Sequence, residues 1–369
     1  MRRMSSVLVA LVAIITLAGG TAVRPAVAEP TAVATATAVG PDAWLDPLTI
    51  PVIQARFDRG VMSSAGLTAS YLRRIHALDD DVNSILKLNP AAAAEAAASD
   101  AYRHTYGPRS RLEGIPVLLK DNIDTADLGN TAGSRALLGS RPAKDAKLVR
   151  RLRSAGAVIL GKANLSEWAN FRGALSTSGW SAVGGQTNNP YVLDRNPCGS
   201  SSGSGAAVAA ALAQVAIGTE TDGSIVCPSG VNGVVGHKPT LGLVSRSGVV
   251  PISAQQDTAG PMARHVVDAA ITMNVIQGAD PSDPATGAIP ADQPKVYRLD
   301  GHALRGARIG VWRLAGANAQ VDAIVQRSVQ TIRAAGATVV EVQIDDTVLF
   351  DDEFTALISE FKRDIARYL

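Results

Sequence analysis

The stretch from Cys198 to Ser224 constrains the fold of this chain more than any other. It reads CGSSSGSG, then the apolar segment AAVAAALAQVAIG, then TETDGS. The apolar segment predicts a buried helix followed by a short strand, and glycine lets the backbone come close to a reacting group. Two glycine-rich turns that carry serines at either end of this buried unit therefore predict an active site.

Lys120 is the candidate base for a serine nucleophile, because it ends the apolar, strand-like run GIPVLLKDNID at its lysine. A serine hydroxyl reacts when a neighbour takes its proton, and a lysine can do so if burial leaves its amine neutral. The alternative is a strand-end lysine whose amine reaches solvent. The chain has five histidines. None shares a glycine-rich turn with a serine, although His237 follows the serine region closely in sequence.

Three sequence blocks occur in a family order: GIPVLLKDNID, NPCGSSSGSG and GTETDGSIVCPSGVNGVVGHKPTLGLVS. They resemble the amidase signature family of serine hydrolases, and they are most similar to its exported, peptide amidase-like branch. The resemblance covers roughly residues 48–273. It implies that Ser224 is the nucleophile that forms an acyl-enzyme and that Ser200 is a bridging serine. It also implies a cis peptide bond between Gly199 and Ser200, and it implies that Lys120 is the base.

The spacing also allows a physical interpretation of the turn that carries the nucleophile. Ser200 would take the proton of Ser224 and donate its own to Lys120, and Ser201 would orient the lysine or its loop. Backbone N–H groups in the turn would stabilise the developing oxyanion. These groups belong to Thr221, Asp222, Gly223 and Ser224.

The chain departs from the broad family pattern at three positions. Asp222 stands where many members have a third glycine, and Val226 stands where many have an arginine. Both residues fit the peptide amidase-like branch, and the role of that arginine has no counterpart here. His237 stands where an aliphatic residue is usual, and we interpret it as a satisfied core or edge histidine without a catalytic role.

The two cysteines flank the two candidate serines. Cys198 precedes Ser200 and Cys227 follows Ser224, so a working relay would bring the two thiols near each other. An exported protein with two cysteines can form a disulfide. Two buried thiols are the alternative, and we favour it slightly.

The first 28 residues predict a secretory signal. A basic start, MRRMSS, precedes the apolar run VLVALVAIITLAGG and a small-residue end, AVA, before Glu29. The run is too short to span a bilayer comfortably, so we expect a secreted or extracytoplasmic protein without a stable membrane anchor. Cleavage there removes three arginines and no acidic residue, which changes the formal net charge from +2 to −1. A surface so close to neutral favours no nucleic acid partner.

Strand and helix patterns alternate along the rest of the chain. With 369 residues, 46% of them hydrophobic, the chain can form a large core. We expect an α/β fold, the amidase signature fold that the resemblance implies, with a mixed sheet covered by helices on both faces. The expected helices are 67–79, with Thr68 as the cap, 91–106, 145–156, a segment after Leu165, and 321–335. The expected strands are 84–88, 157–161, 308–312 and 338–344.

The expected domain organisation has a flexible leader at 29–47 and one amidase signature domain at 48–369. Within it we expect a core at 48–279, an exposed connection at 280–294, and a C-terminal part at 295–369 that the resemblance implies to be incomplete. The last helical stripe, from Phe354 to Leu369, is apolar and ends without a C-cap.

These observations predict an exported amidase that hydrolyses carboxamide C–N bonds. By resemblance, its substrate is a C-terminal peptide amide or a small organic amide, and no cofactor is implied. The alternative is a truncated, catalytically inactive binding or remnant protein of the same fold. Ammonia-supplying subunits of tRNA amidotransferases share the three blocks, but the signal sequence argues against that cytoplasmic role. Scattered histidines and the absence of an HExxH motif argue against a metal site.

Overall fold

The structure is a computed structural model that describes residues 40–290, 296–313, 318–343 and 350–369. The expected signal sequence, 1–28, and most of the expected leader lie outside these ranges. The folded domain begins earlier than the expected domain boundary at Leu48. Ala43–Leu45 forms a 3-10 helix, and Leu45 is fully buried.

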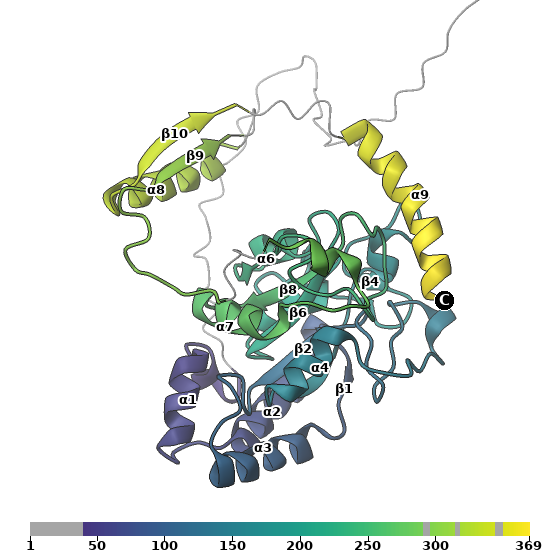
Figure 1. Cartoon of the computed structure of the whole chain (residues 1–369), viewed down its shortest axis with the longest axis vertical. Coiled ribbons are helices and arrows are strands. Elements are labelled where there is room, and N and C mark those ends of the chain that lie inside the picture. The colour runs from purple at the N-terminus through teal and green to yellow at the C-terminus, as the bar shows by residue number, and fades with distance from the viewer. Residues whose placement is uncertain (1–39, 291–295, 314–317, 344–349) are drawn as a thin grey trace, which may run out of the picture. The chain divides into compact units, whose positions relative to one another are not determined.

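The largest sheet in the described ranges has six strands (Figure 1). Its spatial order is β1-β3-β2-β6-β8-β7. The strands are β1 Ile85–Leu88, β2 Pro116–Lys120, β3 Val158–Ala163, β6 Val215–Glu220, β7 Val235–Gly236 and β8 Thr258–Ala263. Strand β2 is parallel to both β3 and β6, whereas β1 and β8 run antiparallel to their neighbours. The expected mixed sheet is therefore confirmed.

Helices flank this sheet, as expected for an α/β fold. Helix α5 contacts β6 and α7 contacts β8. The helices are α1 Ile50–Asp58, α2 Ser64–Val82, α3 Ala92–Tyr106, α4 Lys147–Ser154, α5 Ser202–Ala209, α6 Val226–Val231 and α7 Val266–Ile276. The expected cap of α2 is wrong, because Ser63 caps the helix through Gly66 N and Thr68 lies buried inside it. A short hairpin pairs two strands of two residues each, β4 Trp180–Ser181 and β5 Gly185–Gln186.

The central strands are buried along their whole length, which places any charge on them inside the core. Every residue of β2, β3, β6 and β8 is buried. Functional residues of open α/β sheets gather at the carboxyl ends of parallel strands. Here Lys120 ends β2 and Glu220 ends the parallel neighbour β6.

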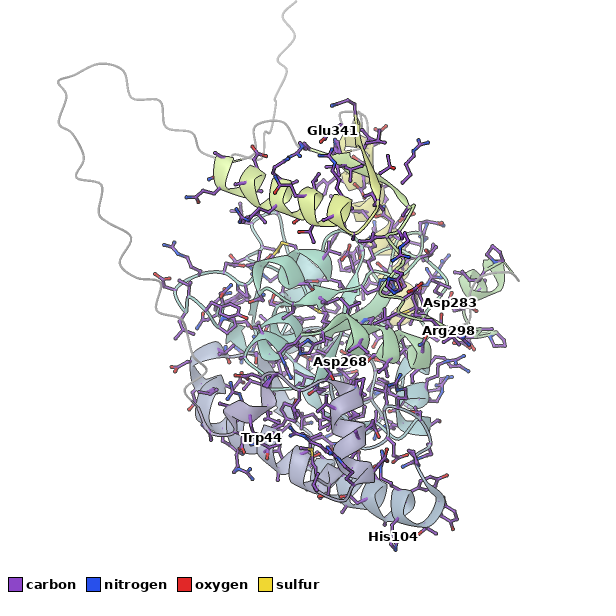
Figure 2. All side chains as sticks on the ribbon, turned by 90° about the vertical axis from the view of Figure 1, so that its left-hand side faces the viewer. Trp44, His104, Asp268, Asp283, Arg298 and Glu341 are labelled. Atoms are coloured by element: carbon purple, nitrogen blue, oxygen red, sulfur yellow. A yellow bond between two sulfur atoms is a disulfide. The ribbon has the colours of Figure 1, made fainter. Side chains whose placement is uncertain are left out.

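Buried carboxylates connect distant segments to this core. Asp268 of α7, labelled in Figure 2, accepts hydrogen bonds from Ile50 N at 2.8 Å and Gln214 Nε2 at 2.7 Å. Asp283, also labelled there, binds Arg246 at 2.6 Å and is buried. The expected connection at 280–294 is only partly exposed: Pro281, Ser282, Pro284, Gly287 and Ala288 are exposed, whereas Asp280, Asp283 and Thr286 are buried. It includes a 3-10 helix, Pro284–Ala288.

The C-terminal elements match their expected ranges closely. Strands β9 Arg308–Trp312 and β10 Thr338–Val342 pair in parallel, and α8 Ala319–Ala334 connects them in sequence (Figure 1). Helix α9, Phe350–Tyr368, follows. Phe361 of α9 packs against Trp168 and Phe171. In the described ranges, no helix is both long and apolar enough to cross a membrane.

The segment after Leu165 is not the expected α-helix. Glu167–Asn170 forms a 3-10 turn, and Trp168 and Ala169 have φ near +50°. This left-handed backbone is uncommon for residues with a side chain. Ala169 lines the cavity of the candidate active site, so the irregular turn forms part of the wall around the serines.

Candidate active site

The fold brings Lys120 and Ser200 into direct contact although 80 residues separate them. The Nζ atom of Lys120 lies 2.7 Å from Oγ of Ser200, and both residues are fully buried. The peptide bond between Gly199 and Ser200 is cis, as the resemblance implied. A side chain at position 199 would clash with the hydroxyl oxygens of Ser166 and Ser202, which explains glycine at this position.

Neutral groups surround the amine of Lys120. Its Nζ lies 2.8 Å from Oγ1 and 3.2 Å from the carbonyl oxygen of Thr219. Burial lowers the pKa of Lys120 from 10.5 to about 7, although the negative charges of Glu220 and Asp257 oppose this shift. Desolvation penalises the ammonium form, so a substantial fraction of this amine is uncharged near neutral pH. The alternative of a lysine that reaches solvent is wrong.

A second lysine, Lys162 of β3, is equally buried but differently paired. Its Nζ donates to the carbonyl oxygens of Ile123 and Gly129, and it lies 3.3 Å from a carboxylate oxygen of Asp121. Burial lowers the pKa of Lys162, and the charge of Asp121 opposes this. This pair ties the loop after β2 to the sheet. Sequence reasoning missed Lys162, although its place in the apolar run AVILGKA was a usable signal.

Ser224 lies in the same narrow cavity as Ser200. The cavity also has Asn122, Thr219, Thr221 and other residues in its wall, and its free volume is about 10 Å³, roughly one water site. Ser224 is buried, and its carbonyl accepts a hydrogen bond from Ser201 N at 3.2 Å. No hydrogen bond joins the hydroxyls of Ser200 and Ser224 in the structure as described. Such bonds are often long before a substrate is present.

The turn that carries Ser224 presents free backbone donors. In the described part of the chain, the N–H groups of Asp222, Gly223 and Ser224 donate to no protein acceptor. Gly223 has a φ of +73°, which favours glycine. Thr221 is the fourth residue of the expected set, and its hydroxyl donates to Asp257 at 2.6 Å, which fixes its side chain. The turn can therefore offer several N–H groups to one anionic oxygen.

Glu220 fixes this turn through hydrogen bonds. Sequence reasoning did not identify this residue. Its Oε2 accepts hydrogen bonds from Ile225 N at 2.6 Å and Val226 N at 2.9 Å. Its Oε1 lies 3.3 Å from Nζ of Lys238, which also donates to the carbonyl of Thr221 at 2.8 Å. Glu220 is nearly fully buried. The carboxylate and the lysine therefore fix both ends of the turn around Ser224.

Ser201, the expected supporting residue, is hydrogen-bonded to the backbone of Thr219. Its hydroxyl bonds the backbone of Thr219, donating to the carbonyl at 3.1 Å and accepting from the N–H at 3.2 Å. Since Thr219 contacts the amine of Lys120 through two oxygens, Ser201 fixes the residue that positions the lysine.

The two cysteines form a disulfide, so the expectation of two buried thiols is wrong. Cys198 and Cys227 are bonded, with their Cα atoms 6.0 Å apart. Cys227 is exposed and Cys198 is partly exposed. The bond joins the loop before Ser200 to the helix after Ser224, which limits the separation of the two serine turns.

Other features lie away from this cavity. His237 is not among its wall residues. Its ring packs edge-on against Tyr297, and its Nε2 is buried without a partner among the described residues, so it is not a satisfied histidine.

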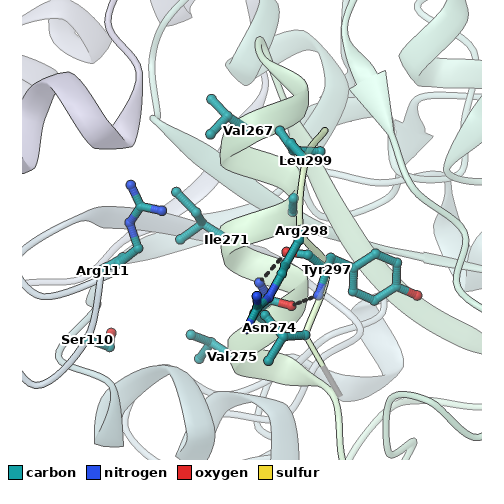
Figure 3. Close-up of a pocket in the computed structure, with 11 residues that line it drawn as sticks. Ser110, Arg111, Val267, Ile271, Asn274, Val275, Tyr297, Arg298 and Leu299 are labelled. Carbon is teal, nitrogen blue, oxygen red and sulfur yellow. Dashed lines mark hydrogen bonds between the residues drawn. The ribbon is translucent and has the colours of Figure 1, made fainter. Parts of the chain in front are cut away.

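A larger pocket of about 490 Å³ lies between α7 and residues 296–299 and shares no residue with the serine cavity (Figure 3). In the described part of the chain, no cluster of three His, Cys, Asp or Glu residues could hold a metal ion.

Comparison with known proteins identifies the family. The family model described as Amidase matches residues 66–369. The X-ray structure of peptide amidase from Stenotrophomonas maltophilia superposes with a TM-score of 0.84 and 52% identity, covering 87% of this chain and 67% of that one. A probable amidase of Arabidopsis thaliana is 44% identical, with coverage of 87% and 64%, respectively.

A putative amidase of Arthroderma benhamiae is 41% identical, covering 84% of this chain and 56% of that relative. The chain thus spans less than two thirds of the length of these curated relatives. Because the family model covers most of the chain and the buried lysine, the cis peptide bond and both serines occupy one site, the chain belongs to the amidase family.

Proposed function

We propose that this protein hydrolyses amide C–N bonds through an acyl-enzyme on Ser224, with Lys120 as the base and Ser200 as the proton relay. One observation carries the proposal: a buried amine with a pKa near 7 lies 2.7 Å from a hydroxyl in the cavity that also contains Ser224. A neutral amine has two N–H donors and one lone pair. The two oxygens of Thr219 can accept both N–H bonds, which leaves the lone pair for the hydroxyl proton of Ser200.

In the proposed acylation, the residues of this site accept and return every proton that moves. Oγ of Ser224 forms a bond to the carbonyl carbon while its proton passes to Ser200, and Ser200 gives its own proton to Lys120. N–H groups at 222–224 stabilise the oxyanion, where each such donor contributes about 3–4 kcal/mol in acyl transfer. The proton then returns to the nitrogen as the C–N bond breaks and ammonia or an amine leaves. In deacylation, a water molecule takes the place of Ser224 as the attacking group, its proton follows the same route, and the acid is released from Ser224.

The substrate class is proposed as C-terminal peptide amides or small organic amides. The likeness to a peptide amidase over 87% of this chain supports it. A panel of peptide amides and simple aliphatic or aryl amides, with liberated ammonia as the readout, ranks these substrates. Hydrolysis of none of them by folded protein would favour the alternative of an inactive binding or remnant protein.

A fluorophosphonate probe tests the nucleophile directly. We expect stoichiometric labelling of the wild-type protein and loss of labelling in Ser224→Ala, because only an activated serine attacks phosphorus at a useful rate. Ser202→Ala is the matched control, since Ser202 lies in the same serine run but is not among the cavity wall residues. Labelling that persists in Ser224→Ala would assign the nucleophile elsewhere.

We also propose that the protein is exported. The support is the composition of residues 1–28, together with a disulfide, which persists mainly in oxidising compartments. Expression of the full chain with fractionation and N-terminal sequencing tests this. We expect an extracytoplasmic form that begins at Glu29, and an uncleaved protein retained in the cytoplasm would contradict export.

A further inference from the structure

Asn122 is a buried side chain with an incomplete set of hydrogen bonds. It is 4% exposed. Its Nδ2 donates to Oγ1 of Thr219 at 2.9 Å, and its backbone carbonyl accepts from Val250 N at 2.9 Å. Its Oδ1 is buried and has no partner among the described residues. A buried carbonyl oxygen without a hydrogen-bond donor destabilises the folded protein, which suggests that this oxygen has a functional role.

The location of Asn122 in the candidate active site indicates what this role is. The residue lies two positions after Lys120, at the carboxyl end of β2, and it lines the cavity together with Ser200 and Ser224. The side chain is held by Thr219, the same residue that holds the amine of Lys120. A fixed, unpaired acceptor therefore stands in the wall of the cavity that contains the candidate nucleophile.

We propose that Asn122 is a substrate-binding residue whose Oδ1 accepts an N–H hydrogen bond from the nitrogen of the scissile carboxamide. This inference rests on the proposed amide hydrolysis and adds a specificity element to it. A primary carboxamide has two N–H donors and needs an acceptor once it leaves water. A buried acceptor that pairs with a substrate N–H discriminates against analogues that lack the donor.

The same hydrogen bond assists departure of the nitrogen. In the ground state the nitrogen lone pair is delocalised into the carbonyl, and in the tetrahedral intermediate it must turn toward the proton returning through Ser200. An acceptor that fixes one N–H limits the rotation of the nitrogen. The C–N bond then breaks as the nitrogen takes that proton, and Asn122 itself neither gains nor loses one.

A different role would explain the position of Asn122 without any contact to substrate. Through Thr219, the residue could simply position Lys120. In that case its loss would slow every acylation alike, whatever the leaving group. Amides and esters of the same acid separate the two roles, because an ester presents no N–H to Asn122 but needs the same base and nucleophile.

The experiment compares kcat/KM for the best primary amide of the panel and for the methyl ester of the same acid. In Asn122→Ala we expect a loss of about ten- to a hundredfold for the amide and a change of less than about threefold for the ester. Asn122→Leu, which keeps the volume, replaces the alanine variant if that variant fails to fold. The matched control is Asn130→Ala. Asn130 is a buried asparagine that donates to Asp124 at 2.7 Å and is not among the cavity wall residues, so its loss affects both substrates equally.

An equal fall for amide and ester in both Asn122 variants, or no fall for either substrate, would overturn this inference while leaving amide hydrolysis intact. A folded wild-type protein that neither cleaves the amide nor reacts with a fluorophosphonate would overturn the proposed function, and the role of Asn122 with it.

Discussion

Lys120→Met should slow acylation strongly and at the same time stabilise the fold. Methionine fills a similar volume without an amine, so the proton of Ser200 loses its acceptor 2.7 Å away. General-base catalysis contributes about 10²–10⁴ in rate, and we expect the rate of fluorophosphonate labelling to fall toward the upper end of that range. His237→Ala should retain most activity, since His237 does not line the cavity.

The pH dependence of the wild-type protein follows from the same lysine. Burial lowers the pKa of Lys120 to about 7, and only the neutral amine accepts a proton. The value of kcat/KM should therefore rise about tenfold per pH unit below that pKa and level off above it. A rate that falls as pH rises from 6 to 8, or full activity in Lys120→Met together with loss in His237→Ala, would require another base.

The effect on stability has a definite sign. Between about pH 7 and 10.5, the unfolded chain holds a proton on Lys120 that the folded protein lacks. The free energy of unfolding therefore increases with pH through this window, and the cost of burying the lysine is largest below it. Lys120→Met removes this cost. Its gain in melting temperature should be largest near pH 6 and should shrink toward pH 10.

Sequence reasoning placed Lys120 and Ser200 in one candidate site, where the structure also has them in contact, because both lie in short motifs with local structural meaning. A charged residue at the end of an apolar run predicted the burial of Lys120, and glycine-rich turns predicted close approach at Ser200. What it missed are two buried charged residues whose partners no sequence motif indicates. Lys162 contacts a loop that follows another strand, and Glu220 binds N–H groups five and six residues further along. Neither pairing has a local pattern.

Sequence patterns give less information where tertiary contacts override local preference. A polar, proline-rich segment predicted an exposed connection, and Pro281, Ser282 and Pro284 are exposed, but Asp280 and Asp283 are buried because they bind Ser245 and Arg246. The cysteine state depended on the same kind of information. Spacing along the chain cannot fix the 6.0 Å between the Cα atoms of Cys198 and Cys227.

Glu220→Ala should reduce kcat/KM by about 10²- to 10³-fold with little loss of secondary structure. The substitution removes the acceptor of two N–H groups directly after Ser224 and leaves the amine of Lys238 without its carboxylate. The nucleophile and the free N–H groups at 222–224 would then lose their fixed geometry, and a displacement of about 1 Å can cost a hundredfold in rate.

Glu220→Gln separates the geometry from the charge of this residue. Glutamine keeps one oxygen that can accept the N–H groups of Ile225 and Val226, so we expect activity within about tenfold of wild type. The charge of Glu220 raises the pKa of Lys120, so its removal should move the midpoint of the pH–rate profile to lower pH. Equal damage in the glutamine and alanine variants would show that the charge, and not the hydrogen-bonded turn, is what Glu220 contributes. An unshifted midpoint in the glutamine variant would instead place the titrating group outside the reach of Glu220.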